Sequence, residues 1–333
     1  MANWMTSNRS FRWWIIAIAV MSVLPFFVPS SILRTCIMAN FMVIFAMSWD
    51  MMSGYTGYVS FGHPFLIGIA GYITAMLSRQ GGFQPEHAVL PLYATIPMGI
   101  AAAVGGGMLF FLPSMRTRGP YFSLLSLAFL MILHRIMIAD PGGMTGGDRG
   151  LTSLPYVTTG VANNYWLSLG IMFAIAVSLW LVAKSDVGHV LKAIRMDEDV
   201  VESSGLSTYR FKRFAFILSA LTAGIGGAFY AHYMGSISPR GAFSYTFLLN
   251  IIISTVIGGM GTIIGSIFGG YFVTFIVEQL RPFLEGAWRF LTYSLVAIAI
   301  VYFQPRGFMG IAKDVAAWFR MKRRGGVQYG EIA

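Results

Sequence analysis

Charged side chains are scarce in this chain. Of its 333 residues, 11% are charged and 56% are hydrophobic, whereas a soluble domain carries roughly 25% charged residues. A folded chain of this composition lacks the polar groups to cover its own surface in water, so lipid must be its solvent. The scarcity excludes soluble protein classes and predicts an integral membrane protein in a lipid bilayer.

The usual marks of catalysis and of cofactor binding are missing as well. Cys36 is the single cysteine, so neither a disulfide framework nor a thiol metal cluster can form. The five histidines make no metal-ligand spacing with cysteine, aspartate or glutamate. No Gly-Lys dipeptide occurs, which excludes a P-loop. We therefore expect no catalytic residue, no metal and no cofactor in this chain.

Few ionisable side chains lie within the apolar segments. They are Asp50, His63, His134, Arg135 and Glu278. Most lie near the expected ends of spans, where snorkelling or capping accounts for them. Proton- and ion-coupled transporters mark their spans with such residues. A transporter without that relay is expected to take its energy from a partner.

Long apolar segments predict an all-α polytopic membrane domain over 13–304. They lie at 13–29, 32–52, 61–78, 89–112, 121–139, 165–183, 214–234, 246–278 and 288–304. Most are close to the ~20 residues that cross a bilayer. No small-residue cleavage site follows the first segment, so we expect a span rather than a signal peptide. The segment 246–278 is too long for one crossing, and 258–262 within it has the composition of a turn.

Basic residues predict the orientation. They gather in the loops 113–120 and 184–213 and in the tail 305–333, and basic loops are cytoplasmic. With the N-terminal 1–12 inside, all three fall inside only if 246–278 crosses twice. The pattern predicts about ten crossings, with both termini cytoplasmic. The net charge of +10 then reflects topology, and we expect no nucleic acid partner.

Two glycine-rich stretches interrupt the spans. The first is Gly-Tyr-Thr-Gly-Tyr-Val-Ser-Phe-Gly-His-Pro at 54–64, and the second is Gly-Gly-Met-Gly-Thr-Ile-Ile-Gly at 258–265. Each is followed by a Gly-Tyr pair, which is a faint internal repeat. Unwound backbone at membrane depth must be buried in protein or line water, and transporters use such breaks at substrate sites. The candidate residues of a translocation path are Gly54, Gly57, Ser60, Gly62, His63, Gly258, Gly259 and Gly261. A tight turn in the first stretch and close helix packing in the second are the alternatives.

The loop 184–213 contains a pattern typical of one amphipathic helix that ends near Gly205. Its apolar face consists of Val187, Val190, Leu191, Ile194 and Val201, at helical spacing. The charged side mixes both signs, with Arg195 and Glu202 among its residues. A lipid-binding helix is more uniformly basic, so the mixture favours a protein partner. A helix resting on the membrane surface is the alternative.

Together these motifs resemble the LivM-type permeases of branched-chain amino acid ABC importers. The likeness lies in 54–63, 145–151, 188–199, 214–228 and 258–265, in the order of that family. It implies a LivH-like second permease, two cytoplasmic ATPases that bind ATP and Mg²⁺, and an external substrate-binding protein, at the bacterial inner membrane. It also implies an ATPase-coupling segment that contains Ala193, Arg195, Asp197, Glu198, Glu202, Ser203 and Gly205.

The resemblance leaves the cargo open. Permeases of this type move leucine, isoleucine and valine, but also other amino acids, urea, short amides and aromatic carboxylates. Two other classes stay open: an ion-coupled secondary transporter, which would need Asp50, His63 and Glu278 as a relay, and a structural subunit without a path of its own.

The predicted hairpin can be tested with a topology reporter fused within 280–287. We expect a signal from the outer side, because a double crossing returns the chain there. The same reporter within 184–213 should give a cytoplasmic signal. A cytoplasmic signal from both positions would contradict the hairpin.

Overall fold

A computed structural model describes residues 18–78, 90–114, 120–140 and 143–283, together with Trp14, Thr117 and scattered positions from 288 to 310. The predicted N-terminal segment 1–12, the loop 79–88 and most of the tail 305–333 lie outside these residues. Within the described part, seven helices are long and apolar enough to cross a membrane. The prediction of a polytopic helical fold is therefore confirmed.

The order of the elements follows the apolar segments closely. The helices are η1 (Leu24–Phe26), α2 (Ser30–Trp49), η2 (Asp50–Gly54), α3 (His63–Ser78), α4 (Leu92–Ser114), α5 (Pro120–Ala139), η3 (Gly147–Arg149), α6 (Val161–Lys184), α7 (Asp186–Met196), α8 (Glu198–Ser203), α9 (Thr208–Met234), α10 (Pro239–Ala242), α11 (Tyr245–Gly258) and α12 (Ile263–Leu280). Strands β1 (Leu151–Thr152) and β2 (Ser236–Ile237) form an antiparallel pair, which the all-helical prediction omitted.

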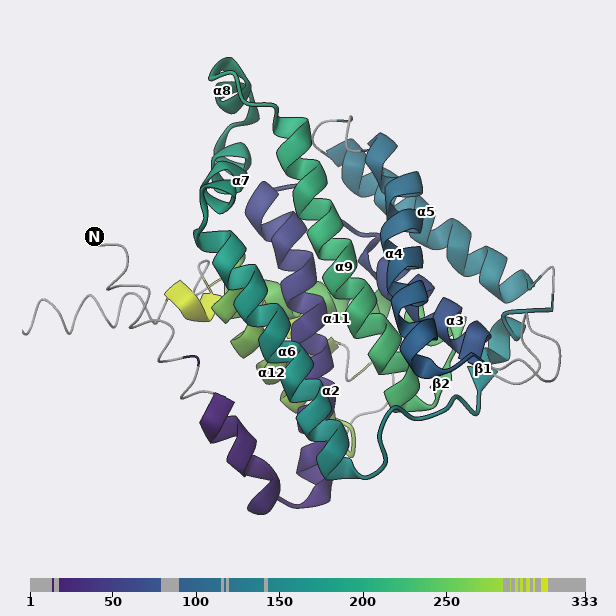
Figure 1. Ribbon diagram of the computed structural model, residues 1–333. Coiled ribbons are helices and arrows are strands. Elements are labelled where there is room, and N and C mark those ends of the chain that lie inside the picture. The colour runs from purple at the N-terminus through teal and green to yellow at the C-terminus, as the bar shows by residue number, and fades with distance from the viewer. Residues whose placement is uncertain are drawn as a thin grey trace, which may run out of the picture.

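Helix α2 is the centre of the fold, and it packs against α6, α9, α11 and α12 (Figure 1). Asn40, fully buried in α2, joins three of these helices. Its amide donates to the Ser168 hydroxyl of α6 at 2.9 Å and accepts from the Tyr271 hydroxyl of α12. Because lipid has no hydrogen-bonding groups, polar side chains of this kind hold helices together in membranes.

Helices α7 and α8 form an arm that continues from α6, with α7 beside α9 and α8 at the far tip (Figure 1). The prediction of a single helix here is wrong, because Asp197 breaks it. The backbone of Asp197 is extended, and its carboxylate accepts from the amides of Asp199 and Val200 at the start of α8. Aspartate is a favoured N-cap residue. The predicted apolar face is nonetheless present, with Leu191, Ile194 and Val201 buried.

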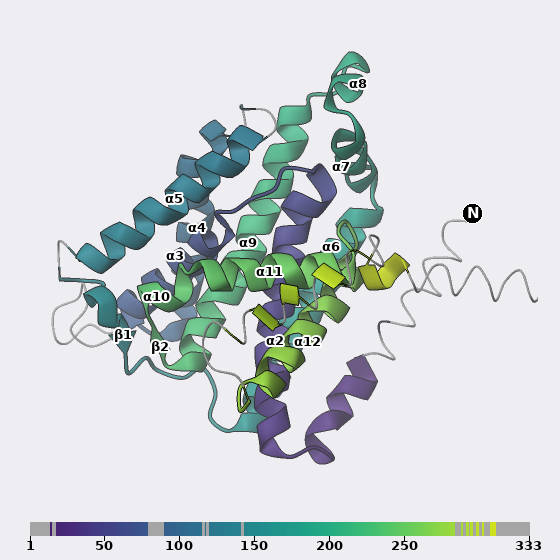
Figure 2. The ribbon, with the colours of Figure 1, turned by 180° about the vertical axis from the view of Figure 1, so that it is seen from behind.

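The segment 246–278 divides into α11 and α12, which pack against each other as a hairpin. Figure 2 shows α11 lying across the other helices. A Cβ on Gly258 would lie 2.0 Å from the Gly265 carbonyl oxygen, and one on Gly269 would lie 1.8 Å from the Ser254 carbonyl oxygen. Small residues permit this close approach of backbones. The predicted break near 258–262 is therefore present in the structure.

Gly269→Ala should destabilise the protein by about 1–3 kcal/mol, the usual cost of overpacking, because its methyl group would overlap α11. The matched control is Gly170→Ala in α6, where an added Cβ meets nothing within 4 Å. That variant should be neutral or slightly stabilising, since alanine favours helix. Thermal unfolding of the detergent-solubilised protein measures both. Equal midpoints for the two variants would contradict the tight hairpin.

Candidate functional site

The first glycine-rich stretch is an unwound link between α2 and α3. Helix α2 runs into the π-helical turn η2, and Gly57 follows with a φ of +80°. The Trp49 indole donates to the Ser60 carbonyl at 2.7 Å, and the Ser53 hydroxyl accepts from the Ser60 amide at 3.0 Å. Single π turns are frequent at functional sites. The link is held within protein, as backbone at membrane depth requires, which disfavours a simple solvent-exposed turn.

Two ionisable side chains of this region lie deeper than expected. Asp50 and His63 are 0% and 1% exposed, so snorkelling at a span end does not account for them. The His63 Nε2 lies 2.6 Å from the Ser48 hydroxyl, and the Ser219 hydroxyl of α9 donates to the Ser48 carbonyl. The imidazole therefore ties the start of α3 to α2.

Asp50 joins the two glycine-rich stretches. Its Oδ1 accepts from the Gly261 amide at 2.7 Å, across 211 residues of sequence. A Cβ on Gly54 would lie 1.8 Å from this oxygen and 2.7 Å from the Gly261 nitrogen. Gly261 itself has a φ of +78°, which favours glycine. The tip of the α11–α12 hairpin therefore sits directly on the π turn of α2.

Arg195 of the arm reaches the same place. Its guanidinium donates to the Gly54 carbonyl at 2.5 Å, and a Cβ on Gly261 would lie 2.8 Å from the Arg195 Nη1. A carbonyl at the end of a helix needs such a donor from elsewhere. We call Asp50, Gly54, Gly261 and Arg195 the glycine junction. The sequence pattern placed Arg195 on the charged side of the arm. The residue is exposed overall, but its guanidinium reaches back to the Gly54 carbonyl.

Glu198, at the start of α8, makes a second inward contact. Its carboxylate pairs with the Lys212 ammonium at 2.6 Å and accepts from the Tyr58 and Thr208 hydroxyls. The side chains of Lys212 and Glu198 are only 5% and 16% exposed. Burial raises the pKa of Glu198, but the hydrogen bonds from Lys212, Tyr58 and Thr208 outweigh it and hold the pKa below its usual range.

Sequence reasoning missed Lys212 and Tyr58 as members of this cluster. Lys212 counted only as a basic residue of a cytoplasmic loop, and Tyr58 only as part of a glycine-rich stretch. Their partner Glu198 lies 14 and 140 residues away along the chain, respectively. Lys212 lies before the predicted apolar segment 214–234 and beside Arg210 and Arg213, so no signal in the sequence distinguished it from its basic neighbours.

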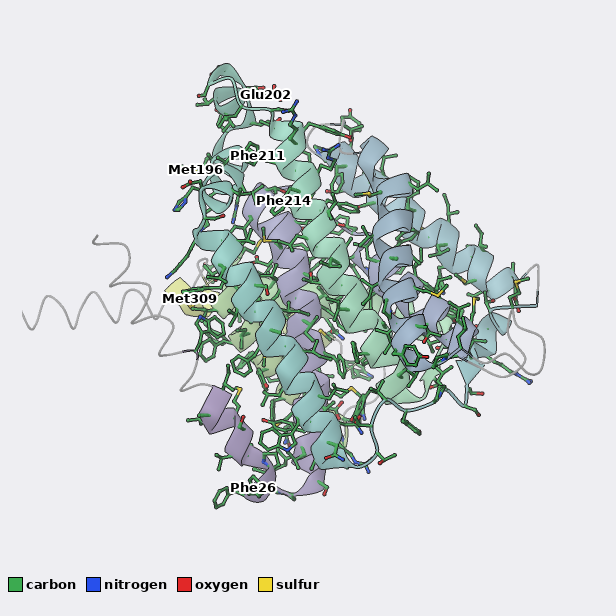
Figure 3. All side chains as sticks on the ribbon, viewed as in Figure 1. Phe26, Met196, Glu202, Phe211, Phe214 and Met309 are labelled. Carbon is green, nitrogen blue, oxygen red and sulfur yellow. The ribbon has the colours of Figure 1, made fainter. Side chains whose placement is uncertain are left out.

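The outward side of the arm is partly apolar. Met196 is 88% exposed and Val200 is 59% exposed. Figure 3 shows Met196 on the outer flank of α7 and Glu202 towards the end of the arm. The sequence pattern singled out neither Met196 nor Val200, because both fall between the predicted apolar and charged faces. Exposed apolar groups on a projecting element are typical of a protein contact.

The remaining residues of the predicted coupling segment have mixed surroundings. Asp197 caps α8, Ala193 is half-buried, and Ser203 and Gly205 are exposed at the end of the arm. The Glu202 carboxylate accepts from the Thr208 hydroxyl at 2.6 Å. The arm therefore has an inward side, which contacts the helices, and an outward side.

The predicted path residues are brought together but are mostly covered within this subunit. Of the eight, Gly57 is exposed; the buried ones are Gly54, Ser60, Gly62, His63, Gly258, Gly259 and Gly261. Their role in translocation stays a prediction.

On the side of the molecule opposite the arm, the loop 145–151 packs against the segment between α9 and α10. Asp148 of η3 pairs with Arg240 of α10, and β1 pairs with β2. A Cβ on Gly150 would lie 2.1 Å from the Ile237 carbonyl oxygen. This loop is therefore a packed element and not a free turn.

Known proteins resemble this chain along most of its length. A family model described as the permease component of branched-chain amino acid transport systems matches residues 31–303. The high-affinity branched-chain amino acid permease LivM of Escherichia coli K12 is 25% identical, over 96% of this chain and 78% of its own. The probable permease LivH of Methanocaldococcus jannaschii is 21% identical, over 86% of this chain and 92% of its own. The ribose import permease RbsC of Haemophilus influenzae is 24% identical over 43% of each chain. No solved structure matches the chain.

Lys212→Met should destabilise the protein, because it leaves the Glu198 carboxylate buried without its cation. Removal of one partner from a buried pair costs about 3–5 kcal/mol. Asp148→Asn is the control, since its pair with Arg240 is 47% and 73% exposed and such pairs contribute about 0–1 kcal/mol. Equal thermal midpoints for the two variants at neutral pH would contradict the role of the cluster.

Glu198→Gln tests the same cluster by its pH dependence. The folded-state pKa of Glu198 is lowered, so its contribution to stability is complete above the usual glutamate range and is lost as pH falls through the lowered pKa. The wild-type protein should therefore be more stable than the variant near neutral pH, and the difference in unfolding midpoint should shrink on acidification. A difference that grows in acid would be the opposite of this expectation.

Proposed function

The chain belongs to the permease components of branched-chain amino acid transport systems, whose family model spans residues 31–303, and from this premise we propose that it forms half of the translocation path of an ABC importer for leucine, isoleucine and valine. Members of this family are multi-pass, non-catalytic membrane subunits. The family match over most of the chain is the observation that carries the proposal. In this proposal an external substrate-binding protein delivers the cargo at the bacterial inner membrane.

The second half of the path is, in this proposal, a LivH-like permease. The chain is similar to LivM and to LivH permeases alike, which is the relation expected of two homologous subunits that face each other across a shared path. Two ATPases dock on the cytoplasmic side, and ATP and Mg²⁺ bind there and not on this chain.

The proposed topology has about ten crossings with both termini cytoplasmic. To the seven long helices it adds α3, which is a shorter apolar helix, and the segments 13–29 and 288–304. A helix of the length of α3 spans about 24 Å, less than the ~30 Å hydrocarbon core. In this proposal the irregular, partly buried link 57–62 before it supplies the missing length.

The two sides of the arm supply a mechanism. We place the ATPase contact on the outward side, at Met196 and Val200. The inward side holds the glycine junction through Arg195, so a movement of the arm is passed to both glycine-rich stretches at once. The link 57–62 is also fastened to α5, because the Ser126 hydroxyl accepts from the Phe61 amide at 3.0 Å. In this mechanism α5 and the hairpin tip move together when ATP closes the ATPases.

The function is tested by uptake of radiolabelled leucine into proteoliposomes that contain the complete importer with its binding protein. We expect ATP-dependent accumulation that disappears when this chain is omitted, and no uptake by this chain alone. Uptake by this chain alone would favour a secondary transporter. An importer that ignores leucine, isoleucine and valine but takes up urea or a short amide would keep the class and overturn the cargo.

Two neighbouring residues separate docking from coupling. Met196→Asp places a charge on the outward side, so copurification of the ATPases should fall about tenfold or more, as for loss of an interface hot spot. Arg195→Gln leaves that side intact but removes the charge at the glycine junction, so the ATPases should stay bound and hydrolyse ATP without uptake. The same phenotype for both variants would contradict the two-sided arm.

A further inference from the structure

A cleft of about 520 Å³ lies between the arm, the link 57–62 and the start of α5. Small-molecule sites usually have volumes of about 300–1,000 Å³. Its walls include Val59, Phe61, Pro120, Ile194, Arg195 and Glu198. One cation, one anion and a group of apolar side chains thus share a single cleft.

The two charged residues keep hydrogen-bonding capacity for a ligand. A guanidinium carries five N–H donors, and the bond to Gly54 occupies Nη1 of Arg195. A carboxylate ligand needs two such donors for a bidentate contact. The Glu198 carboxylate accepts from Lys212 and Thr208 at Oε1 and from Tyr58 at Oε2. A carboxylate has about four acceptor sites, so Glu198 has capacity for one further donor.

This combination matches one chemical class, a free amino acid with an apolar side chain. As a zwitterion it presents a carboxylate, an ammonium group and a hydrocarbon side chain close together. By comparison, the smaller cavity of about 160 Å³ beside Ile67, Gly227 and Phe247 has only uncharged residues in its described lining. Of these two cavities, the cleft at the arm provides both charges that a zwitterion requires.

We propose that this cleft is a cytoplasmic binding site for an apolar L-amino acid, with the ligand carboxylate on Arg195, its ammonium on Glu198 and its side chain against Val59, Phe61, Pro120 and Ile194. The proposal rests on the proposed function, which supplies the orientation of the chain and the class of cargo.

The position of the site predicts that a bound ligand affects ATP-driven import. A ligand on Arg195 and Glu198 holds the inward side of the arm against the link 57–62. If ATP-driven closure moves the arm, the ligand binds one state better than the other, and a ligand shifts an equilibrium by that difference in affinity. Amino acid that has accumulated in the cytoplasm therefore binds at this site and slows further import.

The experiment uses the assembled importer without its binding protein, in nanodiscs, so that both faces are accessible and no cargo is delivered from outside. Binding of radiolabelled L-leucine and its effect on ATP hydrolysis are measured together. Leucinol lacks the carboxylate and 4-methylpentanoate lacks the ammonium group. Each should compete about tenfold or more weakly than leucine, because each loses a charge-assisted hydrogen bond.

A pair of variants at Pro120 places the binding in the cleft. Pro120 is the exposed first residue of α5. Pro120→Trp fills the cleft with an indole. Pro120→Ala leaves the cleft open, and like the tryptophan variant it removes proline from the first position of α5. Leucine should bind to the wild type and to Pro120→Ala and slow ATP hydrolysis in both. Its affinity for Pro120→Trp should be about tenfold or more lower, because the indole takes up space that the ligand needs in the cleft.

The absence of saturable leucine binding in the wild type would overturn the proposal. So would leucine binding by Pro120→Trp as tight as by the wild type, or competition by either analogue as strong as that by leucine itself. Leucine uptake by the complete wild-type importer is measured in parallel. Normal uptake without cytoplasmic binding overturns this site alone, whereas the absence of uptake points to failure of the proposed function.

Discussion

Backbone groups released from a helix inside a membrane must find partners within the protein, because lipid offers none. This protein breaks its helices at 57–62 and at 259–262, and side chains of other elements pair with backbone groups at or beside these breaks. The Gly261 amide binds the Asp50 carboxylate, and the Gly54 carbonyl accepts from Arg195. The packing of α2, the placement of the hairpin and the seating of the arm all depend on these bonds.

Small residues make the arrangement sterically possible. Glycines at the junction and along the hairpin leave no room for a Cβ, and the Ser219 and Thr255 hydroxyls donate to carbonyls of α2 at 2.6 and 3.2 Å. Such contacts bring backbones together directly, and not through long flexible side chains. A displacement that Arg195 passes from the arm to the Gly54 carbonyl is therefore expected to reach the hairpin tip through these close backbone contacts, which suits a subunit that receives its energy from bound ATPases.

The arm has different chemistry on its two sides. Met196 and Val200 face outward, while Arg195 and Glu198 face the helices. The same two charged residues line the cleft at the start of α5. In the proposed mechanism this short element receives a signal from an ATPase, passes it to the glycine-rich stretches and binds an amino acid from the cytoplasm.

Four features could be predicted from the amino-acid sequence alone: the membrane class, most spans, the break in 246–278 and the family resemblance. These follow from the composition of consecutive residues, because lipid as a solvent selects long apolar runs and breaks demand glycine. Three features appear only in the folded structure: the burial of Asp50 and His63, the contacts of Arg195 and Glu198 with the long helices, and the division of the arm at Asp197. The partners of Asp50, Arg195 and Glu198 lie as many as 211 residues away, and periodicity within one segment carries no record of what that segment meets after folding.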